Sequence, residues 1–128
     1  MSTVQTETTE TRQVSDDPLK SLTPVIRLAI AATSNPHGSE FGRGVAKLCR
    51  GVQDKGSLNA AAKDMGMAYS KAWRILRDTE TALGVTLLHR DGAHGSTLTE
   101  DCERLLKAYS EMEERLQQIA REEFRSAL

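Results

Sequence analysis

The 128-residue sequence lacks the main features of secreted, membrane-spanning and disulfide-stabilised proteins. Its two cysteines, Cys49 and Cys102, are too few for a disulfide framework, and we expect them to stay reduced. The longest apolar stretch, Ile26–Ala32, is interrupted by Arg27 and is too short to span a bilayer. The N-terminus lacks the basic and apolar regions of a secretion signal. These absences favour a soluble, cytoplasmic protein.

Sequence motifs of catalysis are also missing. The sequence has no Gly-rich phosphate loop, no nucleophile motif and no paired carboxylates in a context that would bury them. We therefore expect neither an enzyme nor a cofactor. A metal site built from His89, His94 and Cys102 is an alternative, but these residues match no recognised ligand spacing, and structural zinc normally needs four ligands.

The net charge of -1 conceals a strong asymmetry along the chain. Residues 24–99 carry ten basic and six acidic side chains, whereas residues 1–23 and 100–128 are both net acidic. A basic region attracts polyanions whatever the total charge, although such imbalances also occur on ordinary solvated surfaces. The charge pattern therefore points to the middle of the chain as the candidate binding region.

Three regions differ in composition. Residues 1–21 are rich in Thr, Glu, Ser and Asp and poor in apolar residues, which predicts a disordered acidic tail. Residues 22–33 contain β-branched residues and end in a turn-forming sequence, which predicts a short strand. Apolar residues from Phe41 to Val52 then recur at helical spacing, and Gly56 is placed to end that helix.

Two helices joined by a tight turn are predicted next. Ser57 can cap the first, and the small residues Ala61 and Ala62 would let the two helices cross closely. Gly66 suits a turn that needs positive φ, and the second helix runs from Ala68 to Leu83. This is the pattern of a helix-turn-helix motif.

The second helix has two distinct faces. With Ala72 as reference, Leu76, Thr79 and Leu83 lie within about 40°, which marks the core face. The opposite face carries hydroxyl and arginine side chains that suit the major groove, with Lys71 at its edge. Trp73 is more consistent with packing, whereas the Tyr69 hydroxyl could also bond a phosphate. The residues predicted to contact DNA are Ser57, Tyr69, Ser70, Lys71, Arg74, Arg77, Thr81, Arg90, His94 and Ser96.

Arg90, His94 and Ser96 belong to a predicted hairpin, or wing, which precedes a long helix. Thr99 with the acidic residues after it forms a strong helix start. Apolar residues along this helix alternate spacings of three and four, which indicates a helix-packing seam and favours a homodimer over a helix folded back on its own domain. The predicted dimer interface comprises Leu105, Tyr109, Met112, Leu116 and Ile119.

The segment GSLNAAAKDMGMAYSKAWRIL, the wing and the long helix together resemble the N-terminal winged helix-turn-helix of molybdate-responsive (ModE-type) regulators, which is related to the LysR-type domain. The resemblance covers about residues 22–120. It implies a dimeric bacterial DNA-binding protein with Ala68–Leu83 as recognition helix and Arg90 to Ser96 on DNA. Because the sequence ends at Leu128, it resembles stand-alone members without the oxyanion-binding domains.

The sequence therefore predicts a mainly α fold with a small β component, organised in three parts. These are a disordered acidic tail (1–21), a winged helix-turn-helix DNA-binding domain (22–99) and a long dimerisation helix (100–128). The predicted function is sequence-specific transcriptional regulation by a homodimer bound to double-stranded DNA. The alternatives are a protein-interaction module that does not bind DNA and a metal- or redox-responsive regulator that uses Cys49, Cys102 or the histidines.

Overall fold

The computed structural model describes residues 17–90 and 95–128, which belong to two compact units. One unit is Arg27–Met112, and the other combines residues 17–26 with Glu113–Leu128. Within the described part of the chain, no helix is both long enough and apolar enough to cross a membrane.

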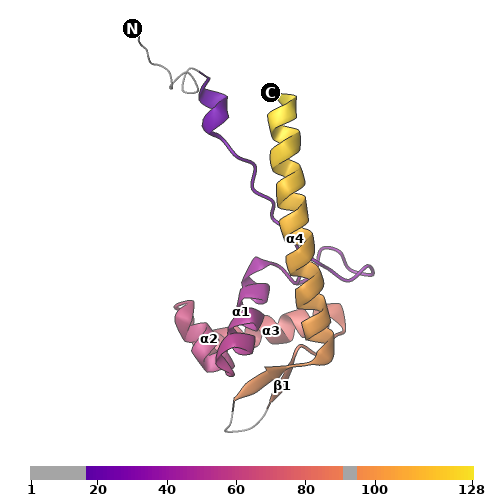
Figure 1. Cartoon of the computed structure of the whole chain (residues 1–128). Coiled ribbons are helices and arrows are strands. Elements are labelled where there is room, and N and C mark those ends of the chain that lie inside the picture. The colour runs from indigo at the N-terminus through magenta and orange to yellow at the C-terminus, as the bar shows by residue number, and fades with distance from the viewer. Residues whose placement is uncertain (1–16, 91–94) are drawn as a thin grey trace. The chain divides into compact units, whose positions relative to one another are not determined.

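The unit Arg27–Met112 has the predicted winged helix-turn-helix architecture (Figure 1). It consists mainly of helices, with one two-stranded antiparallel sheet that precedes the long final helix. The final helix continues beyond Met112 into the second unit. The elements are α1 (Arg43–Lys55), α2 (Leu58–Asp64), α3 (Tyr69–Leu83), β1 (Leu88–Arg90), β2 (Ser96–Leu98) and α4 (Glu100–Ala127).

The helix ends follow the capping signals in the sequence. Gly56 and Gly84 end α1 and α3 in the left-handed conformation, with φ values of 78° and 69°. The Ser57 hydroxyl accepts a hydrogen bond from the Ala60 N–H at 3.1 Å and so caps α2. The Thr99 hydroxyl accepts one from the Cys102 N–H at 3.0 Å and so begins α4. These interactions are local, which is why the boundaries could be predicted.

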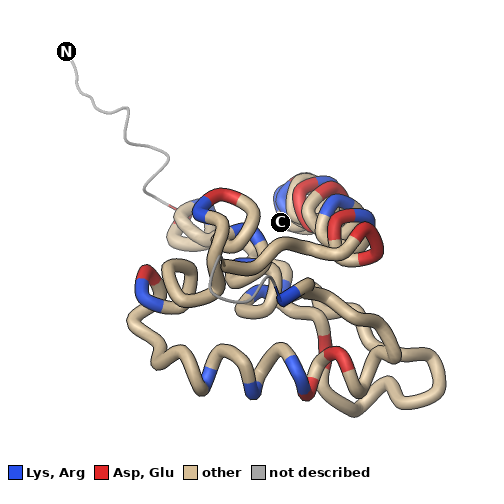
Figure 2. Tube along the Cα trace, turned by 90° about the horizontal axis from the view of Figure 1, so that it is seen from below, with Lys and Arg blue, Asp and Glu red and all other residues tan. Residues whose placement is uncertain are grey.

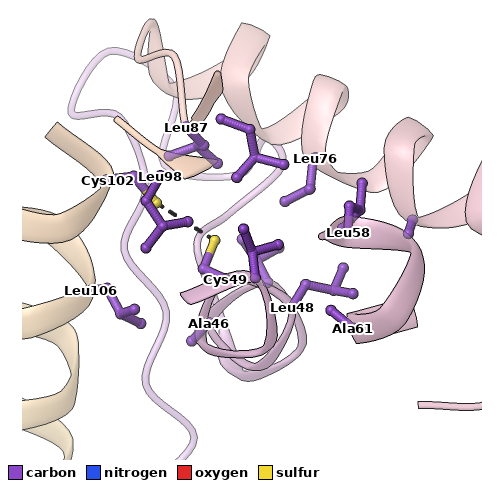
Figure 3. Close-up of a cluster of buried hydrophobic side chains, with 14 of the residues drawn as sticks. Ala46, Leu48, Cys49, Leu58, Ala61, Leu76, Leu87, Leu98, Cys102 and Leu106 are labelled. Atoms are coloured by element: carbon purple, nitrogen blue, oxygen red, sulfur yellow. Dashed lines mark hydrogen bonds between the residues drawn. The ribbon is translucent and has the colours of Figure 1, made fainter. Parts of the chain in front are cut away.

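The core of this unit draws side chains from every helix and from the sheet region (Figure 3). Ala61 and Ala62 are buried, as predicted for small residues where α2 packs on its neighbours. Phe41 is also buried, but it precedes α1 and packs edge-on against Tyr109 of α4. The fully buried side chains include Phe41, Leu48, Cys49, Leu58, Leu76, Leu87, Cys102 and Tyr109.

The predicted hairpin is present but its strands are short. Leu88 pairs with Leu98 and Arg90 pairs with Ser96. At the start of β1, the Glu80 carboxylate accepts hydrogen bonds from the N–H groups of Leu87 at 2.7 Å and Leu88 at 3.4 Å. The backbone entering the strand is therefore anchored to α3, and ladder pairing begins only at Leu88.

The strand expected over residues 22–33 does not form. Only isolated bridges occur there, between Ile30 and Phe41 and between Ala32 and Asn35. Pro24 has no N–H to donate to a ladder, and the β-branched composition alone provides no pairing partner. This segment is extended without belonging to a sheet.

The second unit pairs an extended N-terminal segment with the end of α4. The Gln117 side-chain amide accepts a hydrogen bond from the Ile26 N–H at 2.9 Å and donates one to the Pro24 carbonyl at 2.6 Å. Pro18–Ser21 forms one turn of 3-10 helix (η3), capped by Asp17. The expected disordered tail is therefore wrong for residues 17–21, because capping supplies local order there. The rest of that tail, 1–16, lies outside the described residues.

The predicted dimer seam on α4 divides into two parts. Tyr109 is fully buried in its own domain, and its hydroxyl donates a hydrogen bond to the Leu28 carbonyl at 2.9 Å. Its assignment to a dimer interface is therefore wrong, because the side chain completes the core of its own chain. Leu105 is partly buried against the same core. Met112, Leu116 and Ile119 are exposed, at 45%, 37% and 46%.

Candidate nucleic-acid interface

Helix α3 separates its buried and exposed residues as the sequence predicts. Ala72, Leu76 and Thr79 are buried. The buried Thr79 hydroxyl donates a hydrogen bond to the Ile75 carbonyl at 2.9 Å. On the opposite side, the side chains predicted for the DNA-facing stripe are all exposed. They are Ser70, Arg74, Arg77 and Thr81, with Tyr69 and Lys71 exposed beside them.

The turn before α3 fixes the direction of this exposed stripe. The N–H groups of Met65 and Met67 both donate to the Ala62 carbonyl, at 3.0 and 2.9 Å. Gly66 lies between them with φ of 65°, and both methionines pack partly buried against the core. Because α2 is anchored by Leu58 and the alanines, the start of α3 cannot rotate freely about the turn.

The exposed cations of this region form no ion pair with another described residue. Within residues 17–90 and 95–128, no carboxylate lies within ion-pairing distance of Lys71, Arg74, Arg77 or Arg90. By contrast, Lys55 and Lys107 are paired with Asp64 and Glu111 at 2.9 and 3.6 Å. Figure 2 marks Lys and Arg positions in blue, and several recur along α3. The unpaired charges are therefore available to an external anion.

An aromatic cluster connects α3 with β1. The guanidinium carbon of Arg90 lies 4.5 Å from the centroid of the Trp73 ring, over its face. The Tyr69 ring stands perpendicular to Trp73, with 6.3 Å between centroids. Trp73 is partly buried, in agreement with its predicted packing role. The stacking of Arg90 on Trp73 was not foreseen, because the two residues are far apart in the sequence and only the hairpin brings them together.

The root of the wing packs tightly on the end of α1. The Ser96 N–H donates to the Gly56 carbonyl at 3.1 Å, and a Cβ at Gly95 would collide with that same carbonyl oxygen. Ser96 is only 6% exposed, so its assignment as a DNA contact is wrong. The alternation of β2 explains this, because Ser96 and Leu98 share the inward face.

The remaining predicted contacts have mixed positions. His94 lies outside the described residues, while Arg90 is exposed. Ser57 is partly buried, and its hydroxyl oxygen already accepts the capping hydrogen bond. The structure thus brings together the exposed α3 residues and Arg90. Ser57 has a structural role instead, because its hydroxyl caps α2.

Of the residues in the metal and redox alternatives, the two cysteines lie together in the core, and His89 lies on the surface. Cys49 and Cys102 are fully buried with their sulfur atoms 3.6 Å apart (Figure 3). His89, by contrast, is exposed. Pairing with the Cys102 thiol, together with burial, raises the pKa of the Cys49 thiol far above its usual range. A protonated, buried thiol reacts slowly, because the thiolate is the nucleophile.

Comparison with known families identifies the central part of the chain. A family model described as "Bacterial regulatory helix-turn-helix protein, lysR family" matches residues 46–103, from within α1 to the first turn of α4. A comparison with curated proteins finds no match. Residues 46–103 are therefore similar in sequence to the helix-turn-helix domain of bacterial LysR-family regulators.

Proposed function

We propose that this protein is a sequence-specific transcriptional regulator that binds double-stranded DNA as a homodimer. In this proposal α3 lies in the major groove, where Arg74 and Arg77 reach base edges and Lys71 meets phosphate. The wing lies on the sugar-phosphate backbone or in the minor groove. The observation that carries the proposal is the exposed face of α3, whose cations have no ion-pair partner among the described residues.

Within the LysR-related regulators, we assign the chain to the ModE-type branch. The support is the resemblance of GSLNAAAKDMGMAYSKAWRIL, which covers α2, the turn and the first half of α3. In this assignment the protein is cytoplasmic, non-catalytic and without a cofactor. Fragments selected from the genome by the purified protein would reveal its operator.

The homodimer is supported by the exposed apolar residues of α4. Met112, Leu116 and Ile119 recur at spacings of four and three, the spacing of a helix-packing seam. A symmetric dimer would place two α3 helices on two half-sites about one helical turn of DNA apart, roughly 34 Å. The operator would then be an inverted repeat.

Binding of a mixed-sequence duplex, measured against salt, tests the DNA-binding role. We expect log K to fall steeply with log salt, because each neutralised phosphate contributes about 0.9 to the slope. Arg74→Gln with Arg77→Gln should weaken binding, and any phosphate contact that either arginine makes should also reduce the slope. The matched control is Arg104→Gln with Lys107→Gln, which removes two exposed, ion-paired cations from α4.

Two results would contradict the role of this face. One is binding that does not depend on salt. The other is equal affinity of the α3 double variant and the α4 control variant. Stable capture of a protein partner without retention on genomic DNA would favour the interaction-module alternative.

A further inference from the structure

The hollow between α3 and β1 combines cationic, aromatic and hydroxyl side chains. Its volume is about 370 Å³. Arg77 and Arg90 both line it, and Trp73 forms part of its wall. The remaining lining residues are Glu80, Thr81, Thr86 and Leu88. The Glu80 carboxylate is engaged by the backbone N–H groups of Leu87 and Leu88, which partly compensates the single acidic charge in the hollow.

The contact with Trp73 leaves the hydrogen-bonding groups of Arg90 available. A cation–π contact is an electrostatic attraction between the positive charge and the ring face, and it uses none of the five guanidinium N–H groups in a hydrogen bond to an oxygen or nitrogen acceptor. No described carboxylate pairs with Arg90. The contact therefore holds the guanidinium beside Trp73 and leaves its N–H groups for a phosphate to accept from.

The same contact reduces the entropy that Arg90 would lose on binding. A free arginine side chain has many rotamers, and fixing it in a complex opposes association. The Trp73 ring is itself held, because Trp73 packs partly buried on the core and meets Tyr69 edge-on. Because the Trp73 ring is held against the core, its contact also restricts the rotamers of Arg90 at the end of β1.

We propose that the hollow between α3 and β1 is a site for one backbone phosphate of the duplex, in which Arg90 donates to the phosphate and Trp73 is its positioning residue. This inference rests on the proposed DNA-binding function and adds a specific link between recognition helix and wing. It gives Trp73 a role that packing alone does not require.

A double-mutant cycle on Trp73 and Arg90 tests the proposal, with a mixed-sequence duplex as probe. Arg90→Gln should weaken binding about tenfold and reduce the salt slope by about 0.9, because one phosphate contact is lost. Trp73→Leu keeps the apolar packing but removes the aromatic face. In the Trp73→Leu background, Arg90→Gln should reduce the affinity for the duplex by a clearly smaller factor than it does in the wild type. Arg104→Gln on α4 is the matched control, and it should change neither the affinity for the duplex nor the salt slope.

Fluorescence provides a second readout, because Trp73 is the only tryptophan in the sequence. We expect duplex binding to change its emission in the wild type and to change it much less in the Arg90→Gln variant. Should Trp73→Leu fail to fold, Trp73→Phe, which retains a weaker aromatic face, replaces it and should give an intermediate loss.

The possible failures are distinguishable. If the wild type binds no duplex, the proposed function fails and this inference fails with it. If the wild type binds and depends on Arg74 and Arg77, but the slope is unchanged by Arg90→Gln, the phosphate site is overturned alone. If the losses from Trp73→Leu and Arg90→Gln simply add, the positioning role of Trp73 is overturned.

Discussion

Gly51 lies where α1 and α2 approach so closely that a single methyl group would change the packing. A Cβ at this position would lie 2.6 Å from the Ala61 Cβ and 3.2 Å from the Ala61 Cα. We therefore expect Gly51→Ala to destabilise the domain by about 1–3 kcal/mol, because strain from overpacking exceeds the gain in helix propensity. The free energy of unfolding in urea measures this change.

Gly44 offers a matched control in the same helix. A Cβ there would meet no atom within 4 Å, so Gly44→Ala should stabilise the domain by about 0.5–1 kcal/mol. Stabilisation of similar size by both substitutions would show that α1 and α2 can separate to admit the methyl group, contrary to the close crossing described here.

Individual residues differ in how far the sequence determines their position. The exposure of Arg74 and Arg77 follows from the 100° rotation per residue of α3 alone, so it could be predicted. The hairpin pattern assigns Ser96 to the DNA-contacting wing without specifying which face it occupies, whereas the β2 alternation with Leu98 places its side chain inward. The Arg90–Trp73 stack depends on the tertiary position of the hairpin, which no local pattern specifies.

At the scale of elements, Thr99 joins the wing to α4 through two hydrogen bonds. Its hydroxyl accepts from the Cys102 N–H at 3.0 Å and donates to the Thr86 carbonyl at 2.6 Å. Thr99→Val preserves the shape and removes both bonds in a buried position, so we expect a loss of about 1–2 kcal/mol in unfolding free energy. Thermal or urea unfolding measures the loss.

Thr97→Val is the control for this change, because Thr97 is exposed on β2 and no hydrogen bond of its side chain occurs within the described residues. Its effect should stay within about 0.5 kcal/mol. An equally small effect of Thr99→Val would mean that the cap contributes nothing to the stability of α4 or of its junction with the wing.

Elements with local signals could be predicted, and elements that need distant partners could not. Gly56, Ser57 and Gly84 mark helix ends through bonds to residues three or four positions away, so the sequence alone indicates them. The segment 22–33 has strand composition, but a strand also needs a neighbour that pairs along its length. Only one bridge, Ile30 to Phe41, links it to the start of the helical domain.

At the scale of the whole molecule, α4 serves two purposes that one periodic pattern did not separate. Cys102, Leu106 and Tyr109 are buried, so the first turns of the helix complete the domain core. The same spacing continues through Met112, Leu116 and Ile119, which are exposed. A helical apolar pattern shows that a face will be covered, but it does not specify whether the same chain or a second copy covers it.

Introducing charged side chains on the exposed apolar part of α4 tests whether a second copy of the chain covers it. Leu116→Glu with Ile119→Glu would place carboxylates in the proposed seam, so we expect sedimentation to show a monomer where the wild type is a dimer. Gln118→Glu adds a negative charge at an exposed position on the opposite side of the same helix and should leave the dimer intact.

The monomeric variant should also bind DNA differently. A dimer joins two phosphate-binding surfaces, so loss of dimerisation should roughly halve the salt slope. It should also reduce the affinity for an inverted-repeat duplex by about 100-fold. Affinity for a single half-site should change little, because Arg74 and Arg77 belong to the other compact unit and remain in place. A wild-type protein that sediments as a monomer when bound to the full repeat would exclude α4 as the dimerisation element, while leaving the α3 face intact as a DNA-binding surface.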